Sequence, residues 1–185
     1  MAMNSLSVLG GNFATKGELD LAGGLVHINT TTFSAVSSVS LNNVFTSDYD
    51  NYRVILTGAG SGSLIVTARL RVGGTDNTGA NFDRQRLYIN GSGVTATRYN
   101  SQTDFALGGF DTPDRGLITF DVFRPFLTTS TLFNAMNSWP ASGSDPVMFI
   151  GVGSNSLTTS FDGFTLIASA GTITGTIRVY GYKNS

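Results

Sequence analysis

The sequence predicts an all-β protein, an antiparallel β-sandwich of jelly-roll-like form that carries an extended N-terminal arm. From about residue 25 onward, apolar and polar residues alternate with a period of two, which is typical of strands that bury one face. Short clusters of Gly, Asn, Asp and Ser interrupt this alternation and supply the residues that tight turns need. No segment shows the spacing of an amphipathic helix. A series of short strands and turns of this kind is typical of a sandwich or a barrel.

The 185 residues are enough for one domain whose core needs no disulfide or metal. We divide the chain into an N-terminal arm, residues 1–32, and a β-sandwich domain, residues 33–185. Residues 1–22 are rich in Gly, Asn, Ser and Leu and are expected to be extended; the rival interpretation is a disordered terminus. Leu19 and Leu21 alternate with polar residues, so we expect this end of the arm to add to the edge of a partner's sheet.

The first half of the domain contains three expected strands. Apolar residues at alternate positions predict strands within residues 39–44 and 52–57, and the second of these carries apolar side chains on both faces. A glycine-rich turn at residues 58–62 leads to the clearest strand, residues 64–72. Residues 73–77 read Gly-Gly-Thr-Asp-Asn and predict the turn that ends it.

The second half continues in the same way. Asn90-Gly91 predicts a two-residue hairpin turn between residues 87–89 and 94–99. Further strands are expected at residues 116–123, 132–139, 146–152, 163–168 and 172–182. The four prolines lie near the ends of these segments, where a missing amide donor is tolerated: Pro113, Pro125, Pro140 and Pro146.

The chain has an unusually low content of charged residues. Only 12% are charged, and 11 basic residues against 12 acidic ones give a net charge of −1, so no basic patch indicates a nucleic-acid partner. Arg69 with Arg71, and Arg84 with Arg86, are each two residues apart and are expected to form solvated faces or interface contacts. A surface of hydroxyl and amide groups loses its water at low cost, which favours a homo-oligomer.

Several classes of protein are excluded by what the sequence lacks. The chain has no cysteine, which excludes disulfides, thiolate zinc sites and cysteine nucleophiles. Residues 1–11 have no basic segment before a short apolar run, so they do not form a signal peptide. The longest apolar stretch, residues 147–152, is too short to span a bilayer, and we expect no membrane partner. Synthesis in the cytoplasm is therefore expected.

No residue is assigned a catalytic, cofactor-binding or metal-binding role, and no cofactor is expected. The single histidine, His27, has no acid or serine motif beside it and is expected to be structural. Residues 48–51 (Asp-Tyr-Asp-Asn) resemble part of a calcium loop but lack the glycine and glutamate of such a loop, so a turn is the better interpretation.

A pair of carboxylates for sugar cleavage would have to come from four dispersed residues, and we regard such a pair as a weak hypothesis: Asp111, Asp114, Asp121 and Asp162. Trp139 is expected in the core and not as a platform for a sugar ring.

Two parts of the chain resemble a known group of proteins. The first comprises SVSLNNVF at residues 38–45, YDNYRVIL at 49–56 and RLRVGG at 69–74. The second comprises FDGFTL at residues 161–166 and GTITGTIRVYGY at 171–182. Together they resemble tailed-phage minor virion proteins, the β-sandwich modules of head decorations and tail fibres. The resemblance implies a β-sandwich that trimerises on a virion, and it implies no catalytic residue.

The resemblance leads to a functional expectation. We expect a non-enzymatic phage virion protein, a trimeric capsid decoration or cement protein that is made in the host cytoplasm and binds the assembled shell. Its partners would then be copies of itself and the major capsid protein or other virion proteins. The alternative is a short receptor-binding tail fibre or tail-tip protein, for which a host-surface glycan is a partner. A carbohydrate-active enzyme is the least favoured class.

Overall fold

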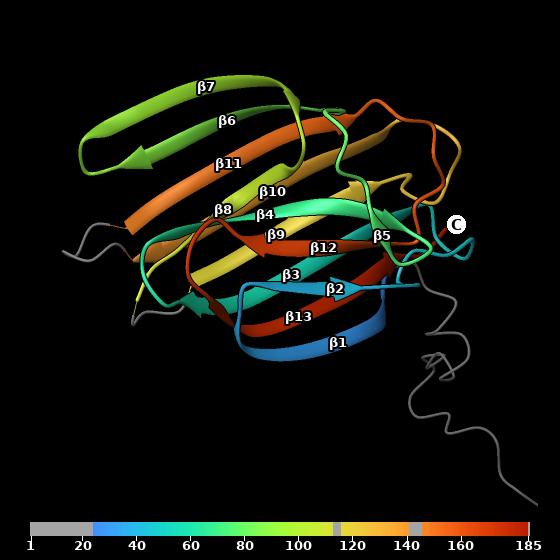
Figure 1. The fold of residues 1–185 in the computed structure, drawn as a ribbon, viewed down its shortest axis with the longest axis horizontal. Coiled ribbons are helices and arrows are strands. Elements are labelled where there is room, and N and C mark those ends of the chain that lie inside the picture. The colour runs from blue at the N-terminus through green and yellow to red at the C-terminus, as the bar shows by residue number, and fades with distance from the viewer. Residues whose placement is uncertain (1–23, 113–115, 141–145, 185) are drawn as a thin grey trace, which may run out of the picture.

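The computed structural model describes residues 24–112, 116–140 and 146–184, and this part of the chain is built from strands without a helix (Figure 1). All of the strands pair in the antiparallel sense and form two sheets. The all-β, antiparallel fold predicted from the alternation of apolar and polar residues is therefore confirmed.

The larger sheet has eight strands. Its first and last strands along the chain are neighbours, because β13 lies between β1 and β3. In spatial order the strands are β1 (Leu25–Val36), β13 (Ile173–Tyr182), β3 (Asn51–Gly60), β9 (Gly116–Phe123), β10 (Thr131–Pro140), β11 (Pro146–Asn155), β6 (Phe82–Asn90) and β7 (Gly93–Gln102).

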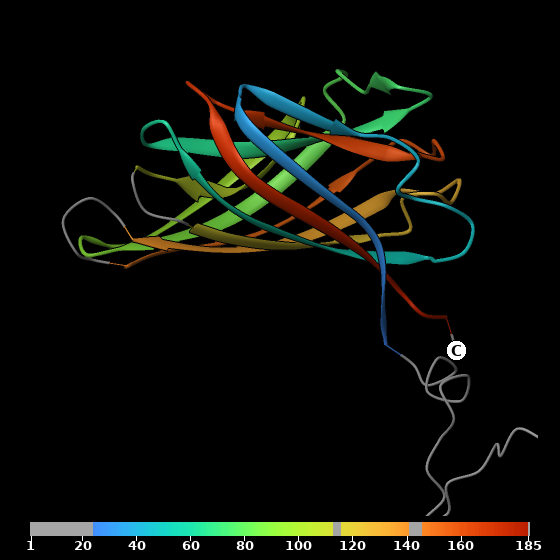
Figure 2. The same cartoon turned by 90° about the horizontal axis from the view of Figure 1, so that it is seen from below.

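The smaller sheet has five strands and lies against one face of the larger sheet (Figure 2). It comprises β2 (Ser38–Leu41), β12 (Gly163–Ala168), β4 (Leu64–Val72), β5 (Thr75–Asp76) and β8 (Phe105–Phe110), the last of which also pairs with β4. A jelly roll distributes eight strands over two sheets. The described residues instead give sheets of eight and five strands, so the jelly-roll form is not confirmed.

Aromatic side chains fill the space between the two sheets. Phe164 on β12 stacks on Phe45 with ring centroids 5.7 Å apart and meets the edge of Phe120 on β9 at 5.6 Å. Phe105 on β8 stacks on Phe133 of β10 at 4.7 Å. Trp139 is also buried, as the sequence predicted. These rings connect the two sheets into a single core.

The turn residues act largely as expected. Gly73 and Gly74 have φ angles of +56° and +80°, a conformation that suits glycine, and they connect β4 to β5. In the β6–β7 hairpin Asn90 pairs with Gly93, so the two turn residues are Gly91 and Ser92, one position later than predicted.

The boundary between arm and domain differs from the sequence prediction. Strand β1 begins at Leu25 and pairs with β13 over most of its length, so residues 25–32 belong to the large sheet and not to an arm. The sequence prediction ended the arm at residue 32, but residues 30–32 are threonines, and β-branched threonine is favoured in strands. The arm predicted for residues 1–22 lies outside the described residues.

Candidate functional site: an apolar surface on the large sheet

The face of the large sheet that points away from the small sheet carries a cluster of exposed apolar side chains, which we call the apolar face. Along β9, β10, β11, β6 and β7, alternate side chains point inward to the core, and those between them point outward. Eight outward side chains are 36–67% exposed and define the apolar face: Leu87, Val94, Leu117, Leu132, Met136, Met148, Ile150 and Val152. They are eight of the twelve exposed large apolar side chains among the described residues.

Strand pairing places these side chains in rows that cross the sheet. One row contains Ile55, Thr119, Met136, Ile150, Leu87 and Ala96, on consecutive strands from β3 to β7. The adjacent row contains Thr57, Leu117, Ser138, Met148, Ile89 and Val94. Neither row contains a charged residue or an aromatic ring. Because neighbouring strands are about 4.8 Å apart, each row is about 24 Å long.

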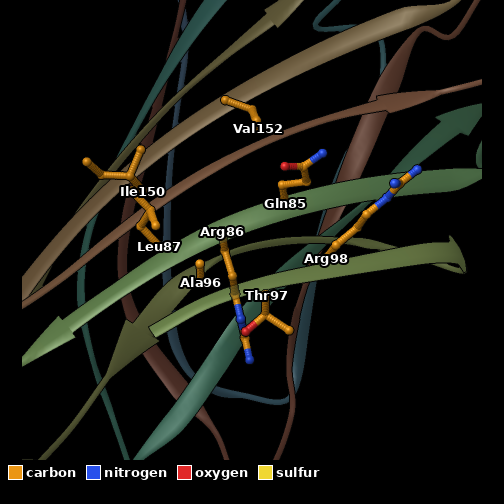
Figure 3. A pocket seen from close by; sticks show the side chains of 8 residues that line it. All are labelled: Gln85, Arg86, Leu87, Ala96, Thr97, Arg98, Ile150 and Val152. Atoms are coloured by element: carbon orange, nitrogen blue, oxygen red, sulfur yellow. The ribbon is translucent and has the colours of Figure 1, made fainter. Parts of the chain in front are cut away.

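The apolar face is hollowed where β11, β6 and β7 meet. A shallow groove of about 540 Å³ lies there, and Leu87, Ala96, Ile150 and Val152 give it an apolar lining (Figure 3). Four polar or charged residues also line the groove: Gln85, Arg86, Thr97 and Arg98. The groove is thus a hollow in a broad, open apolar surface and not an enclosed pocket of the kind that surrounds a small ligand.

Charged groups lie in the row that borders the two uncharged rows; it contains Arg53, Asp121, Asn134, Val152, Gln85 and Arg98. Arg53 on β3 donates hydrogen bonds of 2.8 Å to both carboxylate oxygens of Asp121 on β9, and the Tyr182 hydroxyl donates to Asp121 Oδ1 at 2.7 Å. Burial, together with the hydrogen bond to Asp121, raises the pKa of Tyr182 to about 12. The hydrogen bond to Asp121 also raises the pKa of Arg53. Asp121 is therefore held in place by an ion pair with Arg53 and a hydrogen bond from Tyr182.

The paired arginines occupy different environments from those expected. Arg71 is buried, and its guanidinium donates to Asp76 Oδ1 at 2.5 Å, to Asn42 Oδ1 at 2.9 Å and to the carbonyl oxygen of Gly74. Arg84 is also largely covered and donates to Asp104 Oδ1 at 2.6 Å. The expectation of solvated or interface arginines is wrong for these two, because acidic partners bring them into the protein body.

The histidine and the carboxylates considered from the sequence do not come together. His27 is exposed on β1; its Nε2 lies 2.8 Å from Thr30 Oγ1, and its ring meets the edge of Tyr180. Asp111 accepts a hydrogen bond from the Thr112 amide, whereas Asp162 accepts one from the Gly73 amide. Asp114 lies outside the described residues.

The loop before β3 is held by local hydrogen bonds. Thr46 Oγ1 donates to Asp48 Oδ2 at 3.1 Å, and the Tyr52 hydroxyl donates to the Thr46 carbonyl oxygen at 2.8 Å. Within the ranges that the structure describes, no three His, Cys, Asp or Glu side chains are grouped closely enough to hold a metal ion. The same ranges contain no helix long and apolar enough to cross a membrane.

Comparison with known proteins identifies no relative. No family model matches the sequence, and no curated protein or solved structure matches it significantly. What the geometry defines is a β-sandwich with a broad, exposed apolar surface on the outside of its large sheet.

The sequence analysis did not identify this surface. The nearly continuous apolar run at residues 147–152 was the sequence feature that indicated it. A strand that is covered on both faces has apolar residues at successive positions, whereas a strand with one wetted face has a polar residue at every second position. That run was predicted as a strand and excluded as a membrane segment, but it was not interpreted as a strand covered on both faces. The other members of the apolar face lie on strands far apart in the chain, and only the strand order brings them together.

Proposed function

We propose that this chain is a non-enzymatic structural protein of a tailed-phage particle, a trimeric decoration protein that binds and cements the assembled capsid shell. The observation that carries the proposal is the apolar face. The largest contiguous apolar patch on a monomeric soluble protein is about 300–600 Å² and is often an interaction site, and the apolar face reaches the upper end of this range. The low charge of the whole chain supports the same conclusion, because an uncharged surface can be buried at low cost.

The resemblance to phage virion modules supports the particular class. Residues 171–182, which carry much of that resemblance, supply β13 and the turn before it, in the interior of the large sheet. Residues 161–166 supply the start of β12, and Phe164 there is a central core residue. The shared residues are therefore framework positions, and they favour a common architecture over a common catalytic site.

A cement protein acts by mass action. If it binds the assembled shell and not the loose subunits, it stabilises the shell by about 2.7 kcal/mol for each site when its concentration is 100 times the dissociation constant. A receptor-binding fibre leaves shell stability unchanged and alters attachment to the host. The two functions therefore predict different effects on the heat stability of the shell and on attachment to the host.

The test uses particles that lack this protein. We expect them to adsorb to host cells normally but to release DNA at a lower temperature than complete particles, and we expect purified protein to restore heat resistance. Unchanged heat resistance together with lost adsorption would reject the decoration function and favour the tail-fibre alternative.

The absence of enzymatic function is tested separately. We expect no cleavage of polysaccharide or peptidoglycan by the purified protein. If Asp111 were a general acid or base, the Asp111→Asn variant would lose roughly 10²- to 10⁴-fold in rate. Measurable cleavage that this substitution abolishes would contradict the proposal.

A further inference from the structure

The strands beneath the apolar face have the composition of strands covered on both sides. Val147 and Phe149 of β11 point into the core and are buried, while Met148, Ile150 and Val152 point outward. A strand with one wetted face normally alternates apolar and polar residues, and near-continuous apolar runs belong to strands covered on both faces. The small sheet covers one side of β11, and the sequence of the strand is suited to a second cover on the other side.

The apolar face is large enough for a stable protein interface. Its eight side chains expose on the order of 600 Å² of apolar surface, and the Thr, Ser, Ala and Gln side chains between them extend the area toward the roughly 800 Å² per partner of a standard interface. A flat sheet surface of this kind is what packs against another sheet in β-sandwiches.

The chemistry of the apolar face selects the class of partner. The two rows through Met136 and Met148 carry no charge, so they offer nothing to a phosphate backbone or an anionic headgroup. They also carry no aromatic ring on which a sugar could stack. A protein surface of similar apolar character is the partner that remains.

The charges around the apolar face favour a second copy of the same chain. Arg53 and Asp121 neutralise each other at the margin, and Arg98 and Asp83 on β7 and β6 are of opposite sign. Arg178 on β13 pairs with Ile55 and so ends the row through Met136, which gives the margin three arginines against two aspartates. Two copies of this surface therefore each offer both signs of charge, which can pair across a contact.

We propose that a second copy of this chain covers the apolar face, with the two uncharged rows at the centre of the contact and Arg53, Asp121 and Arg98 at its rim. This inference deepens the proposed function and rests on its trimer: contacts in a three-fold ring are heterologous, so different parts of each apolar face would contact the two neighbouring copies around the axis.

The first test changes the apolar face without touching the core. Met136 and Val152 are 55% and 51% exposed, so the double variant M136K/V152K is expected to fold and to give an unchanged β-sheet circular dichroism spectrum. Light scattering at micromolar concentration should give a trimer for the wild type and a monomer for this variant. The matched control is L25K/V72K, with both residues 44% exposed and outside the apolar face, and it should remain trimeric.

A second test avoids disruptive charges. Because the chain has no cysteine, a single introduced thiol reports on one position, and Val152→Cys is compared with Val72→Cys. Their exposure in one copy is similar, at 51% and 44%. If a copy covers the apolar face, a maleimide should label the first thiol at least 10-fold more slowly than the second. Equal labelling rates in the wild-type background would overturn the inference.

The outcomes separate this inference from the proposed function. A wild-type trimer that persists in M136K/V152K, with equal labelling of the two thiols, overturns the inference alone and leaves a trimer built on another surface. A monomeric wild type overturns both the inference and the trimer. A monomeric M136K/V152K beside a trimeric control supports the inference, whatever the particle experiments show.

Discussion

Replacing Arg71 with methionine tests how the small sheet is held together. The Arg71 and Asp76 side chains are only 11% and 23% exposed, and the guanidinium also donates to Ser40 Oγ at 2.8 Å and Thr165 Oγ1 at 2.5 Å. These contacts connect β2, β4, β5 and β12. Methionine fills a similar volume but leaves the Asp76 carboxylate without its cationic partner, although Thr165 Oγ1 still donates to this carboxylate at 2.6 Å.

The expected cost follows from burial. Removing one partner of a fully buried ion pair costs about 3–5 kcal/mol, and the partial exposure of Asp76 places Arg71→Met near the lower end, at about 3 kcal/mol. The double variant R71M/D76N removes the uncompensated charge as well. Its loss of unfolding free energy should therefore be about 1 kcal/mol smaller than the sum of the losses in Arg71→Met and Asp76→Asn.

The assay is urea unfolding followed by circular dichroism at one fixed protein concentration, because association contributes to the apparent stability. Arg69→Met is the matched control: it lies on the same strand, and its Nε donates to the Thr103 carbonyl oxygen at 3.2 Å, so a cost of about 1 kcal/mol or less is expected. Equal costs for the two single variants, or strictly additive costs for Arg71 and Asp76, would refute the reasoning.

Three further predictions concern other parts of the molecule. The pKa of Tyr182 is raised from 10.0 to about 12, so its stabilising contribution is complete below pH 10 and lost between about pH 10 and 12. Tyr182→Phe should remove a phenol that titrates near pH 12 from an alkaline absorbance titration and weaken this loss of stability. A Cβ on Gly163 would lie 2.1 Å from a backbone oxygen, so Gly163→Ala should cost about 1–3 kcal/mol in urea unfolding, whereas Gly62→Ala, with open space around it, should stay within about 0.5 kcal/mol. Deleting residues 1–22 should leave cooperative unfolding intact but abolish binding to particles in a sedimentation assay; a truncated protein that fails to fold would mean that the arm belongs to the core.

Strands with one buried face were predictable from the sequence. Residues 64–72 were predicted with the bounds that the structure gives, because their alternation is regular and glycine-rich turns flank them. The bounds of residues 163–168 were also predicted, although their first four residues are all buried. Strand β8 was missed. All six of its residues are buried, so it has no alternation, and its Gly108 and Gly109 suggest a turn until Asn137 and Trp139 are seen packed against them.

Strand β6 shows why other strand segments and the apolar face were not predictable from the sequence. Only residues 87–89 of it were predicted, because Arg84 and Arg86 interrupt the apolar pattern of the inward face. Both guanidinium groups lie over the ring of Tyr99, within 5.1 Å of its centroid, and Arg84 also pairs with Asp104. These partners are 13–20 residues away in the sequence. The local pattern therefore cannot show that the two arginines have partners that allow them to occupy the inward face of a strand. The apolar face was missed for the same reason, since it exists only once the strand order is known.

The position of β13 has a consequence for how the protein is made. This strand, near the C-terminal end of the described chain, pairs with β1 on one side and β3 on the other, and the amide of Lys183 donates to the Gly24 carbonyl oxygen at 2.9 Å. Until residues 173–182 have left the ribosome, β1 has no partner in the large sheet and one edge of β3 stays open. The sheet cannot be completed during synthesis, and slow, late folding is expected, since pairing of distant strands must wait for loop closure. A premature stop codon before residue 173 would therefore leave two unpaired strand edges, which are templates for aggregation.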